Sequence, residues 1–229
     1  MSRIMKFPRT VRDYQIRCNS MGFAGSTVLK VDGMNGPNTR KQIALVQDVL
    51  GVDDKRDIFD PSGITRIHWH WTVSGYKVTP RITNHYNGVF DFEGNEYDGG
   101  APPQHQAEYS RHMGVSHSLS SNTGAVGLAV ACLAGVKANW GSMTVDQGKY
   151  PVTWEGIDAM LEKTMELCED FDIYPSPWTT LNHAEIQPNL GIRQKGKWDI
   201  QILPSTPNTI LSAKAAGDMM RARMLEKFG

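Results

Sequence analysis

The segment that most constrains the fold is the run GAVGLAVACLAG at residues 124–135, which has no polar side chain. A strand with one wet face alternates apolar and polar residues, whereas a strand covered on both faces need not. The run therefore predicts a central strand in a sheet that protein layers cover on both sides. Residues 153–171 and 211–228 predict helices for such a layer, and Thr153 is a suitable capping residue for the first of them.

Two further segments predict strands. Residues 64–75, ITRIHWHWTVSG, are rich in β-branched and aromatic residues and end in Ser-Gly. Residues 88–100, GVFDFEGNEYDGG, alternate aromatic and acidic positions around a central Gly94 and predict a β-hairpin. Strands and helices in one stretch of chain indicate an α/β domain, which we place at residues 63–229.

The chain before this domain predicts helices only. Residues 11–21 carry apolar residues at helical spacing before Gly22, and residues 37–50 begin with Pro37 at a position that favours helix entry. Two helices and a tight connector bury little surface, so a third short helix or docking against the rest of the chain is needed. We therefore predict a small all-α module at residues 1–52 and a charged linker at residues 53–62.

Composition excludes several classes of function. The 24 lysine and arginine residues balance the 24 aspartate and glutamate residues, so no basic field indicates nucleic-acid binding. No run of apolar residues is long enough for a membrane span or a signal peptide. The three cysteines form no CxxC motif, and their odd number is a poor disulfide framework. These observations favour synthesis in a reducing cytoplasm, with the thiols buried as small apolar groups.

The chemistry is concentrated in RIHWHWT, residues 66–72. In an extended strand His68 and His70 share one face, which a metal site, a proton shuttle or a tightly packed strand can all use. A third ligand must come from elsewhere, and residues 181–202 offer His183 and Asp199, sixteen positions apart. Pro188, Gly191 and Gly196 make a loop that folds back plausible, and no HExxH helix competes as a source of ligands.

Five motifs in this order give the larger domain a family resemblance. They are HWT at 70–72, HYNGVFDFEGNEYDG at 85–99, HMG at 112–114 with NTGAVGLAV at 122–130, NHAEI at 182–186 and KWD at 197–199. From about residue 62 to residue 203, the chain resembles the zinc-dependent N-acetylmuramoyl-L-alanine amidases, a family that includes the peptidoglycan recognition proteins. The resemblance implies a mixed central β-sheet flanked by helices, and a peptidoglycan substrate.

The resemblance also implies a metal site. His70, His183 and Asp199 would hold Zn²⁺, with water in the fourth position, as catalytic zinc requires. Zinc-activated water would cleave the amide bond between N-acetylmuramic acid and L-alanine. His68 would be a neighbour on the same face, although it can compete as a ligand.

Further residues take roles by the same resemblance. Lys197 would stabilise the oxyanion, and Tyr86 would orient the water or donate a hydrogen bond to the developing charge. The group that moves the proton stays open, and Glu185 is a weak candidate. We expect His112 and Asn122 in the substrate groove; the remaining histidines, His85, His105 and His117, are expected on the surface or in loops.

The N-terminal segment resembles the peptidoglycan-binding module found beside many cell-wall hydrolases. The residues of its turn that carry the resemblance and would form the binding site are Asp32, Gly33, Gly36, Pro37 and Thr39. The same residues could simply form a turn that leads into a helix. Module order and size are typical of a bacteriophage endolysin, a monomer made in the host cytoplasm that acts on the cell wall. A bacterial recycling amidase and a non-catalytic peptidoglycan receptor are the alternatives.

Overall fold

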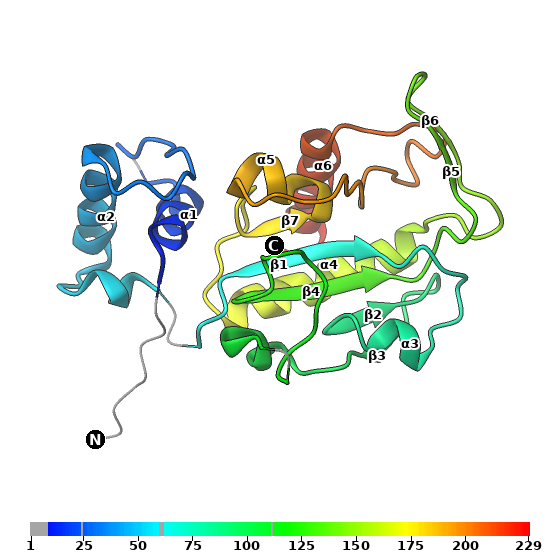
Figure 1. The fold of residues 1–229 in the computed structure, drawn as a ribbon, viewed down its shortest axis with the longest axis horizontal. Helices are drawn as coiled ribbons and strands as arrows, with labels where there is room; N and C mark the ends of the chain where they lie inside the picture. Colours follow the sequence, from blue (N-terminus) through cyan, green and yellow to red (C-terminus); the bar gives the residue numbers. More distant parts are fainter. Residues whose placement is uncertain (1–8, 24, 60–61, 111) are drawn as a thin grey trace.

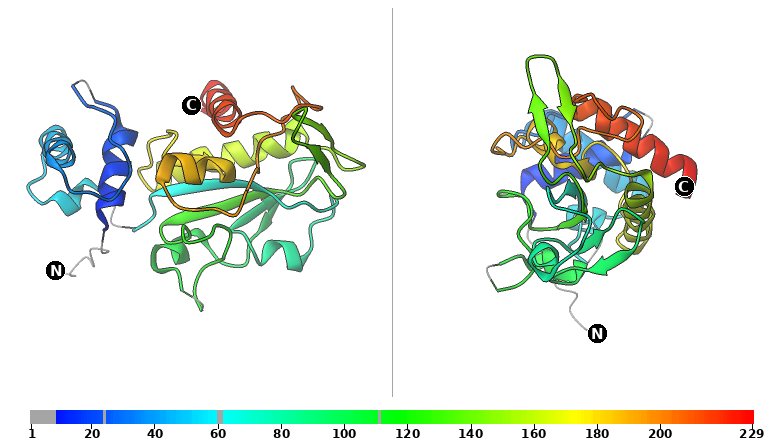
Figure 2. Two further views of the ribbon diagram at one scale, coloured as in Figure 1. Left: turned by 45° about the horizontal axis from the view of Figure 1, so that its top comes forward. Right: turned by 90° about the vertical axis from the view of Figure 1, so that its right-hand side faces the viewer.

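A computed structural model describes residues 9–23, 25–59, 62–110 and 112–229 (Figure 1). Our expectations for residues 1–8 and for residues 60–61 of the linker lie outside this range. The chain forms an α/β domain with a central mixed sheet flanked by helices, preceded by a small helical segment (Figures 1 and 2). Within the described residues, no helix is long and apolar enough to cross a membrane.

The helical segment contains the two predicted helices. Helix α1 spans Val11–Met21 and α2 spans Pro37–Leu50. Thr10 and Asp13 form a reciprocal capping box that starts α1, and Gly22 ends it in the left-handed conformation that glycine adopts readily. A short 3₁₀ helix, η1 (Lys55–Ile58), follows within the expected linker. The fully buried Ile58 packs with apolar side chains of α1 and α2. This part of the expected linker therefore belongs to the apolar core of the helical segment.

The main sheet has the strand order β3-β2-β4-β1-β7. The predicted central run forms β4, which lies parallel between β2 and β1, while β2 and β3 form the predicted antiparallel hairpin. We did not predict β7, nor the separate hairpin β5–β6 that projects from the domain (Figure 1). The strands are β1 (Arg66–Trp71), β2 (Gly88–Phe90), β3 (Glu96–Asp98), β4 (Ala125–Val130), β5 (Lys137–Asn139), β6 (Thr144–Asp146) and β7 (Thr180–Asn182).

The two long helices cover one face of this sheet. Helix α4 (Trp154–Asp170) packs on β2 and β4, and α6 (Ala213–Phe228) packs on β7 and α4 (Figures 1 and 2). Trp69 of β1 points to this layer, where its indole nitrogen donates to the Thr164 hydroxyl at 2.9 Å. Both long helices and the buried cysteines agree with our predictions. Loops and short helices cover the other face: α3 (Pro80–Thr83), η2 (Pro103–Glu108), η3 (His183–Glu185) and α5 (Ile186–Leu190).

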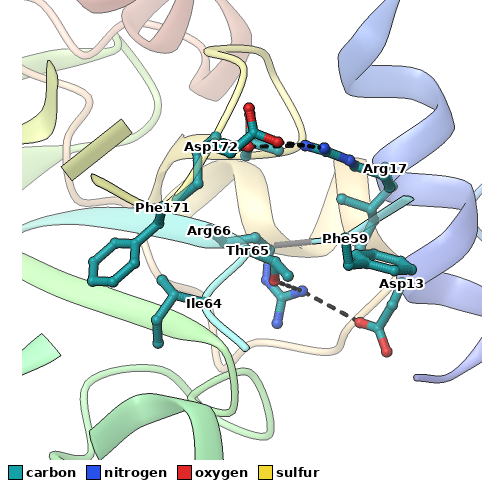
Figure 3. Close-up of a pocket in the computed structure, with 11 residues that line it drawn as sticks. Asp13, Arg17, Phe59, Ile64, Thr65, Arg66, Phe171 and Asp172 are labelled. Atoms are coloured by element: carbon teal, nitrogen blue, oxygen red, sulfur yellow. Dashed lines mark hydrogen bonds and ion pairs between the residues drawn. The ribbon is translucent and has the colours of Figure 1, made fainter. Parts of the chain in front are cut away.

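The helical segment packs directly against the larger domain. Ile16 of α1 and Val31 share a buried apolar cluster with side chains from β7 and α5, among them Leu181. Arg17 forms an ion pair with Asp172 at 2.8 Å, and Asp13 contacts Arg66 at 3.5 Å (Figure 3). The docking that two small helices require is therefore provided by the domain that carries the histidines.

Candidate metal centre

Strand β1 places His68 and His70 on the loop-covered face of the sheet. Both side chains are buried, because β1 lies between β4 and β7 and loops cover this face. His70 lies near the carboxyl end of the strand, where loops from several strands converge. The sequence alternation is thus sufficient to put two imidazoles in one buried pocket and the tryptophan between them on the opposite side.

His183 follows the end of β7 directly. The Asn182 side chain accepts from the Glu185 amide, and the Glu185 carboxylate accepts from the Asn182 amide, so a capping box fixes the turn that presents His183. Asp199 comes from the loop after α5, which folds back as predicted and contains Gly191 and Gly196 at positive φ, whereas Pro188 lies within α5 itself. The Ala184 amide donates to the Asp199 carbonyl at 2.8 Å, which holds the two segments side by side.

Three donor atoms meet at this point. The Nδ1 atoms of His70 and His183 each lie 3.1 Å from Oδ2 of Asp199. All three side chains are buried, and their donor atoms lie within 4.8 Å of one another. Two imidazole nitrogens and a carboxylate oxygen are donors that zinc accepts. His70, His183 and Asp199 therefore form a cluster that can bind a metal ion.

Each imidazole of the cluster is also held by its second nitrogen. Nε2 of His70 lies 3.1 Å from Nδ1 of His117, and Nε2 of His183 lies 3.1 Å from the Gln194 side-chain oxygen. Partners of this kind orient metal-binding histidines and fix which nitrogen faces the metal. The arrangement leaves both Nδ1 atoms directed at Asp199.

Burial and hydrogen bonding determine the charge states here. Burial lowers the pKa of His70 to about 4, although the Asp199 carboxylate opposes this shift. Burial also acts to raise the pKa of Asp199, but hydrogen bonds from His183 and His70 outweigh it and hold that pKa well below its usual range. Near neutral pH, His70 is uncharged and Asp199 is ionised, and these are the forms that coordinate metal.

Tyr86 and Lys197, the two residues expected to act on the substrate, both lie near the cluster. The Tyr86 ring centroid is 5.3 Å from that of His70, and burial raises the pKa of its hydroxyl, which keeps it a proton donor. Lys197 is exposed and lines a cleft of about 610 Å³ together with His117 and His183. Glu185 points away from this cleft, because its carboxylate binds Arg221 of α6 at 2.8 and 2.9 Å.

His117 is the residue that the sequence reasoning missed. It lies in a loop, as expected, but it is partly buried and contacts both His70 and Ser118. With His68 and His70 it forms a second group of close nitrogen donors. Nothing in its spacing distinguishes it from the other loop histidines, since a long irregular loop brings it over the sheet.

The two expected groove residues differ in position. His112 is exposed on a turn and does not line the cleft beside the cluster. Asn122 is buried and lines that cleft, and its side-chain oxygen accepts from the amides of His117 and Ser118. Asn122 thereby fixes the loop that places His117 against His70.

The expected binding turn of the helical segment is a hydrogen-bonded frame. The side-chain nitrogen of Gln15 donates to the Asp32 carboxylate at 2.9 Å and to the Thr39 hydroxyl at 3.3 Å. The backbone amide of Gly33 donates to the side-chain oxygen of Gln15. Gly33 has a φ of +81°, which favours glycine. Gly36 caps α2 and Pro37 begins it. This frame borders a cleft of about 360 Å³.

Comparisons with known proteins find similarity to solved structures only. No protein-family model matches the chain, and no curated protein matches its sequence. Among solved structures, it is similar to the N-acetylmuramoyl-L-alanine amidase LysC from Clostridium intestinale URNW, with 15% identity, a TM-score of 0.42 and coverage of 71% of this chain and 86% of the other. The endolysin amidase LysCS from the same organism gives the same identity and TM-score, with 84% of its chain covered.

Proposed function

We propose that this protein is a zinc-dependent hydrolase that cleaves the amide bond between N-acetylmuramic acid and L-alanine in peptidoglycan. The observation that carries the proposal is the convergence of His70 Nδ1, His183 Nδ1 and Asp199 Oδ2 in one buried cluster. The ordered motifs of the sequence point to the same three residues. When bound there, zinc supplies Lewis acidity and lowers the pKa of water.

The surrounding residues have distinct tasks in this reaction. Tyr86 is partly buried, which raises the pKa of its hydroxyl and keeps it protonated, and it donates a hydrogen bond toward the reacting carbonyl. Lys197 brings a positive charge to the cleft in which the carbonyl oxygen becomes negative. His117 and Gln194 hold the imidazoles in the orientation that points Nδ1 at the cluster. Asn122 supports His117, and His112 is proposed as a more distant substrate contact.

The helical segment is proposed to bind the polymer. Asp32, Gly33, Gly36, Pro37 and Thr39 would frame its contact surface beside the cleft on this segment. A second contact on a polymeric substrate raises the local enzyme concentration without altering the active site. An enzyme with these two parts fits the role of a phage endolysin that acts on the bacterial cell wall.

A turbidity assay on purified sacculi tests the proposed activity. We expect the full chain to clear the suspension, a chelator to stop clearing, and added Zn²⁺ to restore it. Mass analysis of the fragments should find free L-alanine amino termini and intact sugar rings. A non-catalytic receptor would bind the sacculi and release no fragments, and cleavage within the glycan or the peptide would contradict the proposed bond specificity.

A further inference from the structure

A tryptophan at the tip of the hairpin β5–β6 is exposed to solvent. Trp140 directly follows β5, and the residue is 52% exposed. Tryptophan is highly buried on average, so an indole with about half of its surface in solvent is unusual. Figure 1 shows the hairpin on the side of the domain to which the arrows of β1 and β4 point. The exposed indole therefore stands at the carboxyl end of the parallel strands.

The hairpin is held in place by the segment that precedes α6. The Val145 amide donates to the Asn208 carbonyl at 3.1 Å, and the Ile210 amide donates to the Met143 carbonyl at 2.9 Å. These bonds fix β6 and the tip against the rest of the domain. A ligand that contacts Trp140 would thus meet a surface that is already ordered, which lowers the entropic cost of binding.

Three tryptophans form a row from the core to this tip. Trp71 is buried at the end of β1, Trp198 is half-buried, and Trp140 is the outermost. The ring centroids of Trp71 and Trp198 are 5.1 Å apart and those of Trp198 and Trp140 are 5.4 Å apart, both in edge-to-face geometry. Such a contact covers at most one face of a ring, so Trp198 leaves at least one face of Trp140 uncovered.

The middle ring of this row belongs to the segment that carries two candidate active-site residues. Trp198 lies between Lys197 and Asp199 in the chain. Since consecutive Cα atoms are about 3.8 Å apart, the ring of Trp140 lies within about 15 Å of the Asp199 backbone. His70 lies near the same end of the sheet. A polymer bound at the metal centre can therefore reach Trp140 through a short stretch of linked units.

The chemistry of the tip favours a sugar ring as the ligand. The C–H groups on one face of a pyranose carry a small positive charge, and the face of an indole carries a negative one. Among residues 137–146, all of which the structure describes, Met143 is the one other large apolar side chain that is exposed. Binding to a lipid surface scales with buried apolar area, and two apolar side chains offer little. The exposed polar neighbours of Trp140, which can bond to hydroxyl and N-acetyl groups, are Lys137, Asn139, Ser142 and Thr144.

We propose that Trp140 is a stacking site for a sugar ring of the glycan strand, at a distance from the ring that carries the reacting amide. The inference rests on the proposed function, since that amide is joined to a sugar through a lactyl group. The strand would pass from the metal centre along Trp198 to the hairpin. The enzyme would then prefer long glycan strands to a single muramoyl unit.

Substrate length provides the test. Two soluble substrates carry the same single peptide stem, one on an isolated muramic acid ring and one on a glycan of eight rings. The readout is the ratio of their kcat/KM values, long over short. We expect Trp140→Ala to lower this ratio roughly 3- to 10-fold and Trp140→Phe to restore most of it, because a phenyl ring also offers a stacking face. A wild-type ratio in Trp140→Ala would overturn the assignment while leaving the proposed activity intact.

A disturbed active site would give a different pattern. Movement of Trp198 would shift Lys197 and Asp199, and would lower zinc content and the turnover of both substrates by one factor. Trp140→Leu guards against this effect, because it keeps an apolar contact with Trp198 but has no aromatic face. It should lower the ratio as Trp140→Ala does, and a wild-type ratio would overturn the assignment. Leu225→Ala, at an exposed apolar position of α6, is the control and should keep the wild-type ratio.

Direct binding separates this inference from the proposed function. A peptide-free glycan of eight rings is titrated into the zinc-loaded full chain by calorimetry, which requires no hydrolysis. Binding that Trp140→Ala weakens several-fold would support the stacking site even if neither substrate is cleaved, and absence of binding would overturn it. Vesicles of phosphatidylethanolamine and phosphatidylglycerol are the second probe. Vesicle binding that depends on Trp140, without glycan binding, would overturn the inference and assign the hairpin to a membrane surface.

Discussion

The side chains near Asp199 fall into two groups at the scale of single residues. His70 and His183 direct Nδ1 at its carboxylate, whereas His117 and Gln194 contact the far nitrogens of those rings. His68 belongs to neither group, since its Nδ1 lies 3.1 Å from the Ser118 hydroxyl. The two histidines of the HWH motif therefore have different surroundings although they share a strand face.

This difference predicts separate effects on metal content. His70→Ala, His183→Ala and Asp199→Ala should each abolish stoichiometric zinc, because three protein ligands are the minimum for a tight catalytic site. His68→Ala should retain about one zinc per chain, measured by elemental analysis after dialysis. Loss of zinc in His68→Ala with retention in His183→Ala and Asp199→Ala would move the metal to the group of His68, His70 and His117.

A second prediction separates catalysis from metal binding. Tyr86→Phe and Lys197→Ala remove a donor and a charge without removing a zinc ligand. Each should keep its zinc and lose roughly 10²- to 10³-fold in kcat on a soluble muramoyl peptide, as for one oxyanion partner. Lys195→Ala, an exposed neighbour on the same loop, is the control and should keep its rate. Unchanged rates in both test variants would mean that Tyr86 and Lys197 have no part in catalysis.

Some of this site could be predicted from sequence and some could not. His68 and His70 follow from the two-residue period of a strand, and His183 with Asp199 follow from motif order. His117 does not, because its place depends on how an irregular loop is pinned by the Asn122 side chain. Asn122 was expected to meet substrate, and its structural bonds to this loop have no local sequence signal.

At the scale of elements, α6 supports the segment that carries His183. Gly217 faces Glu185, and a Cβ atom at this position would overlap the Glu185 carboxylate. That carboxylate cannot move freely, since Arg221 and the Asn182 amide both bind it. The close approach explains a glycine in the middle of a helix, where it otherwise costs stability.

Gly217→Ala should therefore destabilise the protein, although alanine is the better helix former. We expect a loss of roughly 1–3 kcal/mol, as for overpacking in a core, together with weaker zinc binding. Urea unfolding and zinc titration provide the measurements. Ala222→Gly, at an exposed site of the same helix, should cost only about 1 kcal/mol and leave zinc binding unchanged. A stabilised Gly217→Ala variant would show that η3 is not pinned here.

The two long helices are also joined by an ionic contact. Asp158 of α4 accepts from Arg223 at 2.7 Å and from Lys227 at 2.6 Å. Burial acts to raise the pKa of Asp158, but these hydrogen bonds outweigh it and lower that pKa. A carboxyl group whose pKa is lowered in the folded state stabilises the protein at pH values above the pKa that it has in the unfolded chain, near 4. This contribution to stability is lost as the pH falls below that pKa.

Asp158→Asn should consequently destabilise the protein at pH 7 and have little effect at acid pH. The loss at pH 7 should not exceed about 1 kcal/mol, because the pair is partly exposed. Denaturant melts at a series of pH values measure the difference between variant and wild type. A difference that stays constant from pH 7 to pH 3 would mean that the lost contact is not ionic.

Most elements were predictable because their signals are local. The apolar run at 124–135 became the central strand β4, and Thr153 caps α4 as expected. Strand β7 was missed because it has only three residues, and its pairing with β1 is a long-range event. The hairpin β5–β6 was missed for a similar reason. Its strands show little alternation of apolar and polar residues, and they form a sheet separate from the main one.

The molecule as a whole depends on the junction between its two parts. Ile16 and Val31 cover Leu181, Ile186 and Leu190, which belong to the strand and helix on either side of His183. Removing the helical segment would expose this apolar surface, and each large side chain contributes about 1.5–3 kcal/mol when fully buried. The segment therefore has two separable roles to examine, support of the site and proposed attachment to the polymer.

Two variants separate these roles. A chain of residues 58–229 should melt at a markedly lower temperature than the full chain and bind zinc more weakly, because the cluster next to His183 loses its cover. The full-length double variant Met34→Ala/Asn38→Ala changes only exposed residues that line the cleft on the helical segment. It should keep the wild-type melt and the wild-type rate on a soluble muramoyl peptide, yet sediment with sacculi several-fold less. If the truncated chain melts like the full chain, the junction adds no stability. If the double variant sediments like wild type, attachment to the polymer does not use this cleft.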